Sequence, residues 1–180
     1  MSELKVYPDD DPGHPSVYTD HASIRRELEA VGIRFERWEA SRPLSPDASE
    51  AEILAAYRDS VDRLMGERGF RSVDVLKMVP DHPKKVELRS KFLSEHTHSE
   101  DEVRFFVEGQ GLFNIHRQGK VYAVRCEKGD LIGVPEGTPH WFDMGPNPRF
   151  IAIRLFTNTE GWVAHFTGND IAARFPYLAA

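Results

Sequence analysis

Apolar residues recur with two different periods along this chain, and the change of period separates a helical first part from a strand-rich second part. Over residues 20–31 and again over residues 48–65 the apolar positions follow helical spacing, so two helices are predicted. Asp47 and Ser49 are both suitable N-caps for the second helix. The short run at residues 33–38, between the two helices, is expected to form a strand.

From residue 73 onward apolar and polar residues alternate, as they do in half-buried strands. A short helix is expected over residues 84–92, and further strands follow it. These strands are expected at Val103–Glu108, Gly111–His116, Lys120–Cys126, Leu131–Val134, Trp141–Asp143 and Phe150–Phe156. Turns rich in glycine or proline separate nearly all of them, a layout that favours a sandwich or barrel, most economically a jelly roll.

The chain length of 180 residues suits one domain. Within it, we expect residues 1–72 to form a helix-rich part that packs on the barrel, and residues 73–160 to form the barrel itself. Residues 161–180 are expected to be a C-terminal tail. The predicted fold is therefore mainly β, with packed N-terminal helices.

Composition narrows the possible partners and compartments. With 29 acidic against 23 basic residues the formal net charge is -6, which repels nucleic acid. No apolar stretch approaches the roughly 18 residues of a membrane span, and the start of the chain lacks the layout of a signal peptide. The lone Cys126 excludes an intrachain disulfide and fits a reducing compartment. We therefore expect a cytoplasmic protein with no nucleic-acid or membrane partner, and a monomer.

Four residues carry the most informative chemistry in the chain. His96, His98 and Glu102 lie at even spacing, so in an extended chain their side chains project from one face. His140 comes later, in a turn-rich segment that follows a strongly apolar run. Three imidazoles and one carboxylate form a ligand set for a divalent metal, and up to two positions of a six-coordinate ion would stay open for substrate. The pattern predicts a catalytic metal site.

Two segments resemble the paired motifs of the cupin superfamily. They read His96-x-His98-xxx-Glu102-xxxxxx-Gly109 and Gly129-xxxxx-Pro135-x-Gly137-xx-His140. In cupins these motifs lie on facing strands of a small jelly-roll barrel, the double-stranded β-helix, and converge on one metal ion. Ser90 and Met144 stand where the motifs usually have a glycine at the start and an asparagine at the end. Both departures concern turns and packing, and all four ligand positions are filled.

Longer strings resemble one family within that superfamily, the acireductone dioxygenases of methionine salvage. The strings are KFLSEHTHSEDEVRFFVEGQG, CEKGDLIGVPEGTPHWFDMG and GWVAHFTGNDIA. The resemblance implies an enzyme that cleaves 1,2-dihydroxy-3-keto-5-(methylthio)pentene with molecular oxygen. It also implies that one iron(II) or nickel(II) ion binds at His96, His98, Glu102 and His140.

In this family the carbon atoms that oxygen bridges decide the products. Bridging the two adjacent carbons gives formate and 4-methylthio-2-oxobutanoate, the route associated with iron. Bridging the first and third carbons gives formate, carbon monoxide and 3-methylthiopropanoate, the route associated with nickel. Mixed imidazole and carboxylate ligands suit both ions, so the sequence leaves the metal open.

Charged residues beside the ligands are candidates for further roles. Arg104 lies two residues beyond Glu102, so strand parity aims it at the same interior, where a guanidinium would stabilise a substrate dianion. The family resemblance assigns Arg104 the same role. Asp101 should point to the opposite side, toward a hydrogen bond with a ligand or the backbone, or toward solvent. Glu100 shares the parity of Glu102, and only the motif match selects Glu102 as the ligand.

The apolar methylthio tail of the implied substrate requires an apolar pocket close to the metal. Phe106 and Phe142 share parity with the ligands, Phe92 precedes the first motif, and Trp162 lies in the last of the three strings. Aromatic residues at such spacing are also common in plain core packing. The four are therefore predicted as a group and not one by one.

Two functions of other classes remain compatible with the cupin motifs, because this fold hosts isomerases, oxygenases, lyases and non-catalytic binders. One is another metal-dependent enzyme, such as a zinc isomerase. The other is a non-catalytic protein that binds a small ligand. Retention of all four ligands disfavours the binder, and the long strings around Arg104 disfavour the isomerase.

Overall fold

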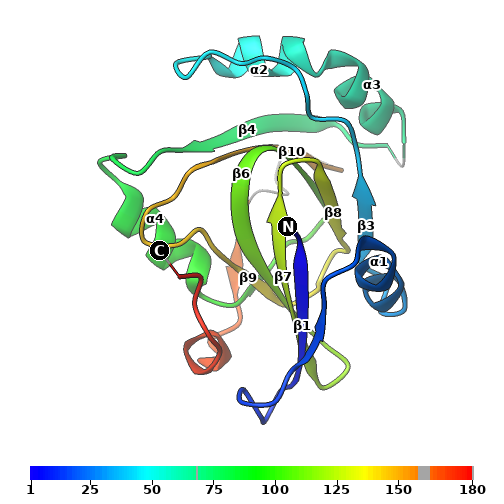
Figure 1. Cartoon of the computed structure of the whole chain (residues 1–180), viewed down its shortest axis with the longest axis vertical. Coiled ribbons are helices and arrows are strands. Elements are labelled where there is room, and N and C mark those ends of the chain that lie inside the picture. Colours follow the sequence, from blue (N-terminus) through cyan, green and yellow to red (C-terminus); the bar gives the residue numbers. More distant parts are fainter. Residues whose placement is uncertain (68, 158–162, 180) are drawn as a thin grey trace.

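Strands dominate the computed structural model, which describes residues 1–67, 69–157 and 163–179 (Figure 1). The strands are β1 (Glu3–Pro8), β2 (Ser16–Tyr18), β3 (Arg34–Arg37), β4 (Ser72–Met78), β5 (His96–Thr97), β6 (Glu102–Arg117), β7 (Lys120–Glu127), β8 (Asp130–Val134), β9 (His140–Asp143), β10 (Phe150–Phe156) and β11 (His165–Phe166). The helices are α1 (His21–Glu29), α2 (Glu50–Ala56), α3 (Arg58–Gly66), α4 (Lys85–Leu93) and the short 3-10 helix η1 (Ile171–Arg174).

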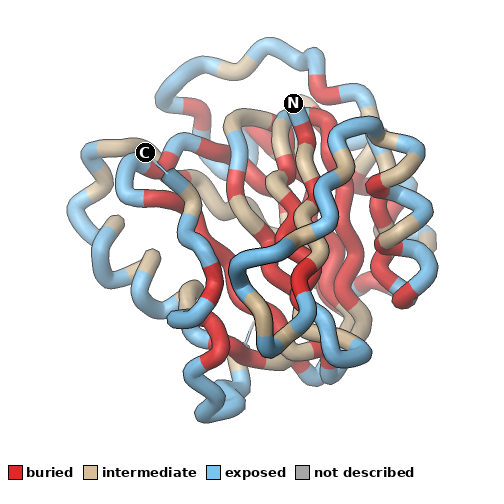
Figure 2. The backbone as a smooth tube through the Cα atoms, turned by 60° about the horizontal axis from the view of Figure 1, so that its bottom comes forward, coloured by how far each residue is buried: buried red, intermediate tan, exposed pale blue. Residues whose placement is uncertain are grey.

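Two hydrogen-bonded layers share β6 and enclose the main apolar core. One layer runs in the order β11-β5-β9-β6-β7-β1-β2, and the other joins β4, β10, β8 and β3 to the first part of β6. The backbone of the central strands is largely buried, whereas the outer turns and helices are exposed (Figure 2). This mainly β, cupin-like arrangement confirms the predicted fold class, although the sheet does not close into a complete barrel.

A single long strand, β6, replaces the two strands and the intervening turn that the glycines near residue 110 had suggested. Residues up to Gly109 pair with β8 and β10, whereas those from Gln110 onward pair with β7 and β9. Gly109 has φ 71°, and a Cβ there would lie 1.8 Å from the carbonyl oxygen of Arg149. The predicted turn is therefore wrong: these residues form a bend where one strand passes from one layer to the other.

The N-terminal helices form close to where the apolar periodicity places them. The Asp20 side chain caps α1 by accepting from the Ser23 amide. The single helix expected over residues 48–65 is instead the pair α2 and α3, which meet at Tyr57, whose ψ of 27° departs from helical geometry. Ser49 caps α2 in a reciprocal capping box with Glu52. Figure 1 shows α2 and α3 above β4 and α1 beside β3.

Both ends of the chain also contribute strands, which the sequence patterns had not indicated. All six residues of β1 pair with β7, and β2 pairs with β1. Near the C-terminus, β11 pairs with β5, the strand that carries His96. The helix-rich N-terminal part and the C-terminal tail are therefore partly built into the sheet. This places the segment after residue 163 directly beside the predicted metal ligands.

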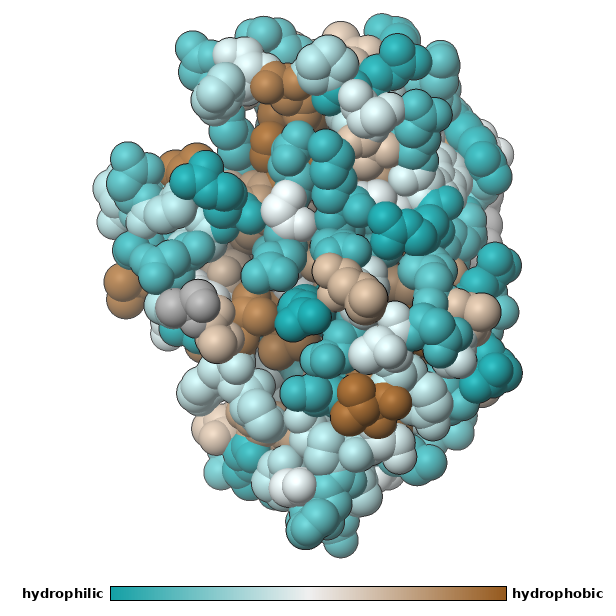
Figure 3. Space-filling view, in the orientation of Figure 1, coloured by the Kyte–Doolittle hydropathy of each residue, from teal (hydrophilic) through white to brown (hydrophobic). Residues whose placement is uncertain are grey.

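Among the described helices, none is long and apolar enough to cross a membrane. The face seen in Figure 3 is mostly hydrophilic, with apolar side chains in small separate groups. The described large apolar residues that are exposed include Val86 on α4 and Phe166 on β11.

Candidate metal centre

Three imidazoles meet inside the fold because two short strands pair in a specific register. Strand β5 pairs with β9 so that His96 lies opposite His140, and β9 pairs in turn with β6. His98 follows directly after β5, in the loop that leads to Glu102 at the start of β6. One ring nitrogen from each histidine can be chosen so that all three lie within 4.8 Å of one another, and all three residues are buried. The predicted histidines therefore come together in space.

The second nitrogen of each ring faces a backbone carbonyl, which fixes the direction of the other nitrogen. A carbonyl can only accept, so Nδ1 carries the proton and donates, and Nε2 keeps its lone pair. Donation of this kind is the usual way in which proteins orient metal-binding imidazoles. The three pairs are His96 Nδ1 to Ser94 O at 2.7 Å, His98 Nδ1 to Val163 O at 3.0 Å and His140 Nδ1 to Thr138 O at 2.8 Å.

Glu102 lies against two of the three imidazoles. Its Oε2 is 3.3 Å from Nε2 of His98 and 3.7 Å from Nε2 of His140, although the cluster of atoms within 4.8 Å of one another contains only the three histidines. Within the described residues, neither Glu102 Oε2 nor His140 Nε2 has a hydrogen-bond partner, and both atoms are buried. Unpartnered buried polar atoms are costly unless something satisfies them. A divalent cation would satisfy both at once, so the residues fit a metal ion.

Electrostatics place these groups in the protonation states that metal ligands need. Burial lowers the pKa of His140 to about 3, and burial also lowers the pKa of His96. Burial alone would raise the pKa of Glu102, but the guanidinium of Arg104 and other nearby positive charges outweigh it and hold that pKa well below its usual range. Near neutral pH the imidazoles of His96 and His140 are therefore neutral and the Glu102 carboxylate is ionised.

Acidification from about pH 7 to about pH 5 is expected to destabilise the metal-free protein. An unfolded histidine has a pKa of about 6.5, whereas folded His140 has a pKa of about 3. Between these values the unfolded state binds a proton that the folded state excludes. The stability present above about pH 6.5 is therefore lost as the pH falls, by up to roughly 1.4 kcal/mol per pH unit for this one group.

Denaturant unfolding of the metal-free protein at a series of pH values measures this effect. The free energy of unfolding should fall less steeply with acidification in a metal-free His140→Gln variant, which lacks the titrating group. If the free energy of unfolding fell equally steeply with acidification in both proteins, the pH dependence could not be assigned to His140.

Arg104 lies fully inside the fold and is bonded to the Glu102 carboxylate. Its Nε and Nη2 donate to Glu102 Oε1 at 3.0 and 2.7 Å. Its guanidinium carbon lies 4.8 Å from the ring centre of Phe113 and 4.9 Å from that of Phe142, within cation–π range. Its Nη1 is buried and has no partner among the described residues. A fixed positive group with one free donor thus borders the carboxylate, as strand parity had suggested.

The acidic residues beside Glu102 accept hydrogen bonds from groups other than the three histidines. Asp101 accepts a hydrogen bond from the Glu136 amide at 2.9 Å, and Gly137 donates to the His98 carbonyl at the same distance. Of the alternatives considered for Asp101, the structure therefore has a bond to the backbone and not to a ligand. Glu100 accepts from the Thr157 hydroxyl. Asp101 thereby ties the turn before His140 to the loop that carries His98.

Two of the four aromatic residues predicted for the pocket, Phe106 and Phe142, lie in the buried core, and Phe142 packs against Arg104. Phe106 and Phe142 are 0% and 1% exposed, and their rings lie 6.2 Å apart. Phe92, on α4, is half-buried, and its ring centre is 6.3 Å from that of Phe142. Trp162 lies outside the described residues. Sequence reasoning missed Phe113, whose ring stacks near His140, because only the β6–β9 register reveals it as the neighbour of Phe142.

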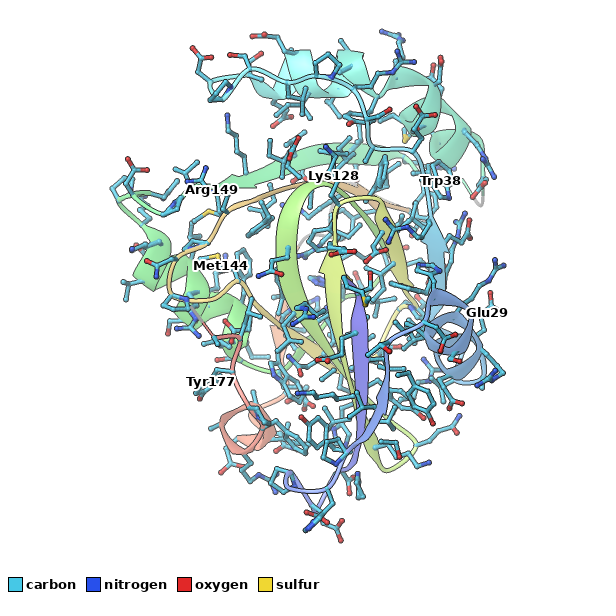
Figure 4. All side chains as sticks on the ribbon, viewed as in Figure 1. Glu29, Trp38, Lys128, Met144, Arg149 and Tyr177 are labelled. Carbon is cyan, nitrogen blue, oxygen red and sulfur yellow. The ribbon has the colours of Figure 1, made fainter. Side chains whose placement is uncertain are left out.

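The two departures from the usual cupin motifs cause no conflict with the site. Ser90 lies exposed on α4. Met144 is 2% exposed and belongs to the main core cluster, and Figure 4 labels it on the connection that follows β9. In this chain that motif position contributes an apolar side chain to the core.

Known proteins resemble this chain over nearly its whole length. The model of the ARD/ARD' family matches residues 5–164. Acireductone dioxygenase of Alcanivorax borkumensis is 59% identical over 179 residues, which are 99% of each chain, and that of Stenotrophomonas maltophilia (strain K279a) is 57% identical over 98% of this chain and 96% of its own. The solved structure of acireductone dioxygenase from Bacillus anthracis, with a cadmium ion in its active centre, superposes with a TM-score of 0.81 at 32% identity, covering 92% of this chain and 98% of that one. Matches of this extent show that the chain belongs to the ARD/ARD′ family of acireductone dioxygenases.

Proposed function

We propose that the acireductone dioxygenase activity of this chain, which its family and full-length relatives indicate, depends on one iron(II) or nickel(II) ion held by His96, His98, Glu102 and His140. The substrate is 1,2-dihydroxy-3-keto-5-(methylthio)pentene, and molecular oxygen is the second reactant. One observation carries the ligand assignment: Nε2 of His140 and Oε2 of Glu102 are buried 3.7 Å apart, and neither has a hydrogen-bond partner in the part of the chain that the structure describes.

The ligand set suits this chemistry. Three neutral imidazoles and one carboxylate leave up to two positions of a six-coordinate ion for the two oxygens of an ene-diolate. When bound, a divalent metal supplies Lewis acidity and a template that orients the chelated substrate. The residue types suit iron and nickel equally, so the metal and its product route must be measured.

Arg104 is the residue proposed to stabilise the substrate as an anion. Glu102 partly neutralises its positive charge, but Nη1 has no partner among the described residues and can donate to a substrate oxygen. Arg104 is only 4% exposed, and an interaction in such a buried site is stronger than the same interaction in bulk solvent. Phe106, Phe142 and Phe92 are proposed to contact the methylthio tail, with Trp162 as a further candidate. Asp101 is proposed to position the turn before His140.

Anaerobic reconstitution tests this function directly. Metal-free protein receives iron(II) or nickel(II), then acireductone, then oxygen, and the ene-diol absorbance is followed together with the products. The iron form is expected to give formate and 4-methylthio-2-oxobutanoate. The nickel form is expected to give formate, carbon monoxide and 3-methylthiopropanoate.

The same assay distinguishes the competing functions. Loss of ene-diol absorbance no faster than the spontaneous background, with either metal, would rule out the dioxygenase. Metal-dependent consumption of substrate without uptake of oxygen would favour an isomerase. Substrate binding without any consumption would favour a non-catalytic binder. The remaining expectations, a monomer in the cytoplasm with only small-molecule partners, stay predictions that sedimentation and cell fractionation can test.

A further inference from the structure

Gly111 occupies the position in β6 where a side chain would strike the ring of Phe142. A Cβ built on Gly111 would lie 2.3, 2.6 and 2.9 Å from three atoms of that ring, closer than carbon atoms approach in folded proteins. The backbone of Gly111 does not have a positive φ, so any residue could adopt its conformation. The requirement for glycine at this position therefore comes from packing alone.

The ring of Phe142 has little freedom to move away from such a side chain. Phe142 is 1% exposed, and its ring centre lies 5.2 Å from that of Phe113 and 5.5 Å from that of Phe150. Phe106 packs on it as well, at 6.2 Å. Cores are packed as densely as organic crystals, so an added methyl group displaces its neighbours. A side chain at residue 111 would therefore shift Phe142 within this aromatic cluster.

Phe142 in turn is one of two neighbouring rings against which the Arg104 guanidinium packs. The guanidinium carbon of Arg104 lies 4.8 and 4.9 Å from the ring centres of Phe113 and Phe142, and these two centres are themselves 5.2 Å apart, so the guanidinium packs against both rings from one side. The two phenylalanines face each other across the β6–β9 pairing. Among the described residues, two of the guanidinium nitrogens are hydrogen-bonded, both to Glu102 Oε1. The rings therefore also help to fix the plane of the guanidinium and the direction of Nη1.

We propose that Gly111 is a positioning residue for the reaction: its missing side chain lets Phe142 lie against Arg104 and so sets the orientation of the guanidinium toward the substrate. The effect on the reaction rests on the proposed function. The structural claim, that residue 111 controls the contact between Phe142 and Arg104, does not depend on that function.

Gly111→Ala tests the proposal. We expect kcat/KM for acireductone to fall by roughly 10 to 100-fold, because small misplacements of a catalytic group have effects of that order. Metal content should be unchanged, because Gly111 pairs with Cys126 of β7 and not with a strand position that holds a proposed ligand. In a Phe142→Leu background the ring atoms that clash are absent, so adding Gly111→Ala should lower kcat/KM by less than about two-fold. If the two substitutions acted independently, their separate losses in kcat/KM would multiply.

Gly66→Ala is the matched control. Gly66 ends α3, has no positive φ, and has nothing within 4 Å of a built Cβ, so this variant should keep the kcat/KM of the unmodified protein. An unchanged kcat/KM in Gly111→Ala, or an equal loss in the presence and absence of Phe142→Leu, would overturn the proposal.

A second measurement does not depend on activity. The NMR signal of the Arg104 Nε–H group in metal-free protein should shift in Gly111→Ala and stay in place in Gly66→Ala. An unmoved signal in Gly111→Ala would refute the structural claim. The unmodified protein could also fail the anaerobic dioxygenase assay while the Arg104 signal still shifts in Gly111→Ala. That result would support the structural claim about residue 111 and show that the proposed function is wrong.

Discussion

His140→Gln is expected to lose its bound metal and, with it, turnover. His140 is 2% exposed, and its Nε2 has no hydrogen-bond partner among the described residues, while its Nδ1 donates to the Thr138 carbonyl. Gln is close to His in size but offers an amide in place of the imidazole lone pair. Changing a residue that merely orients a ligand costs about 10 to 100-fold in metal affinity, so losing the ligand itself should cost at least about 100-fold.

Metal per chain after dialysis, followed by titration of metal into the metal-free variant, measures the loss. His165→Gln is the matched control, because His165 is exposed on β11 and should leave the affinity unchanged. Circular dichroism of both metal-free proteins checks that they fold. A folded His140→Gln protein that binds iron(II) or nickel(II) with unchanged affinity would remove His140 from the ligand set.

Arg104→Lys is expected to keep the metal and to lose turnover by roughly 100 to 1,000-fold, the usual cost of removing a donor that stabilises developing negative charge. Lysine keeps the positive charge that Glu102 needs, but it lacks the planar fork whose Nε and Nη2 bond Oε1 and whose Nη1 is free. The charge is therefore preserved and the geometry is lost. Metal content and kcat/KM in the same preparation separate these two effects.

Arg63→Lys is the matched control, since Arg63 also lies over an aromatic ring, that of Trp38, at 4.3 Å, but on α3 and outside the site. It should turn over as the unmodified protein does. Arg104→Met, in contrast, would leave the buried Glu102 carboxylate without its partner, a change that typically costs about 3–5 kcal/mol of stability. Normal turnover of the Arg104→Lys protein would refute a role for the guanidinium fork in the reaction.

The sequence alone was sufficient to predict those features of this protein that depend on residues close together in the chain. Helical periodicity located α1 and the region of α2 and α3, because an amphipathic helix buries one stripe of its own residues. Strand parity placed Arg104 on the same interior side as Glu102, because both residues belong to one strand. The proposed metal ligands were selected by their match to two short motifs, and each motif is a local property of the sequence as well.

Only the tertiary structure could decide features that join distant parts of the chain. The carbonyl that orients His98 comes from Val163, the register of β9 on β6 brings Phe113 to Phe142, and β1 adds to the sheet by pairing with β7. No local period encodes which strand pairs with which, or in what register, because those choices are set by the burial of whole sheet faces. The sequence thus determined which groups are proposed for the chemistry, whereas the pairing of strands far apart in the chain determined how those groups face one another.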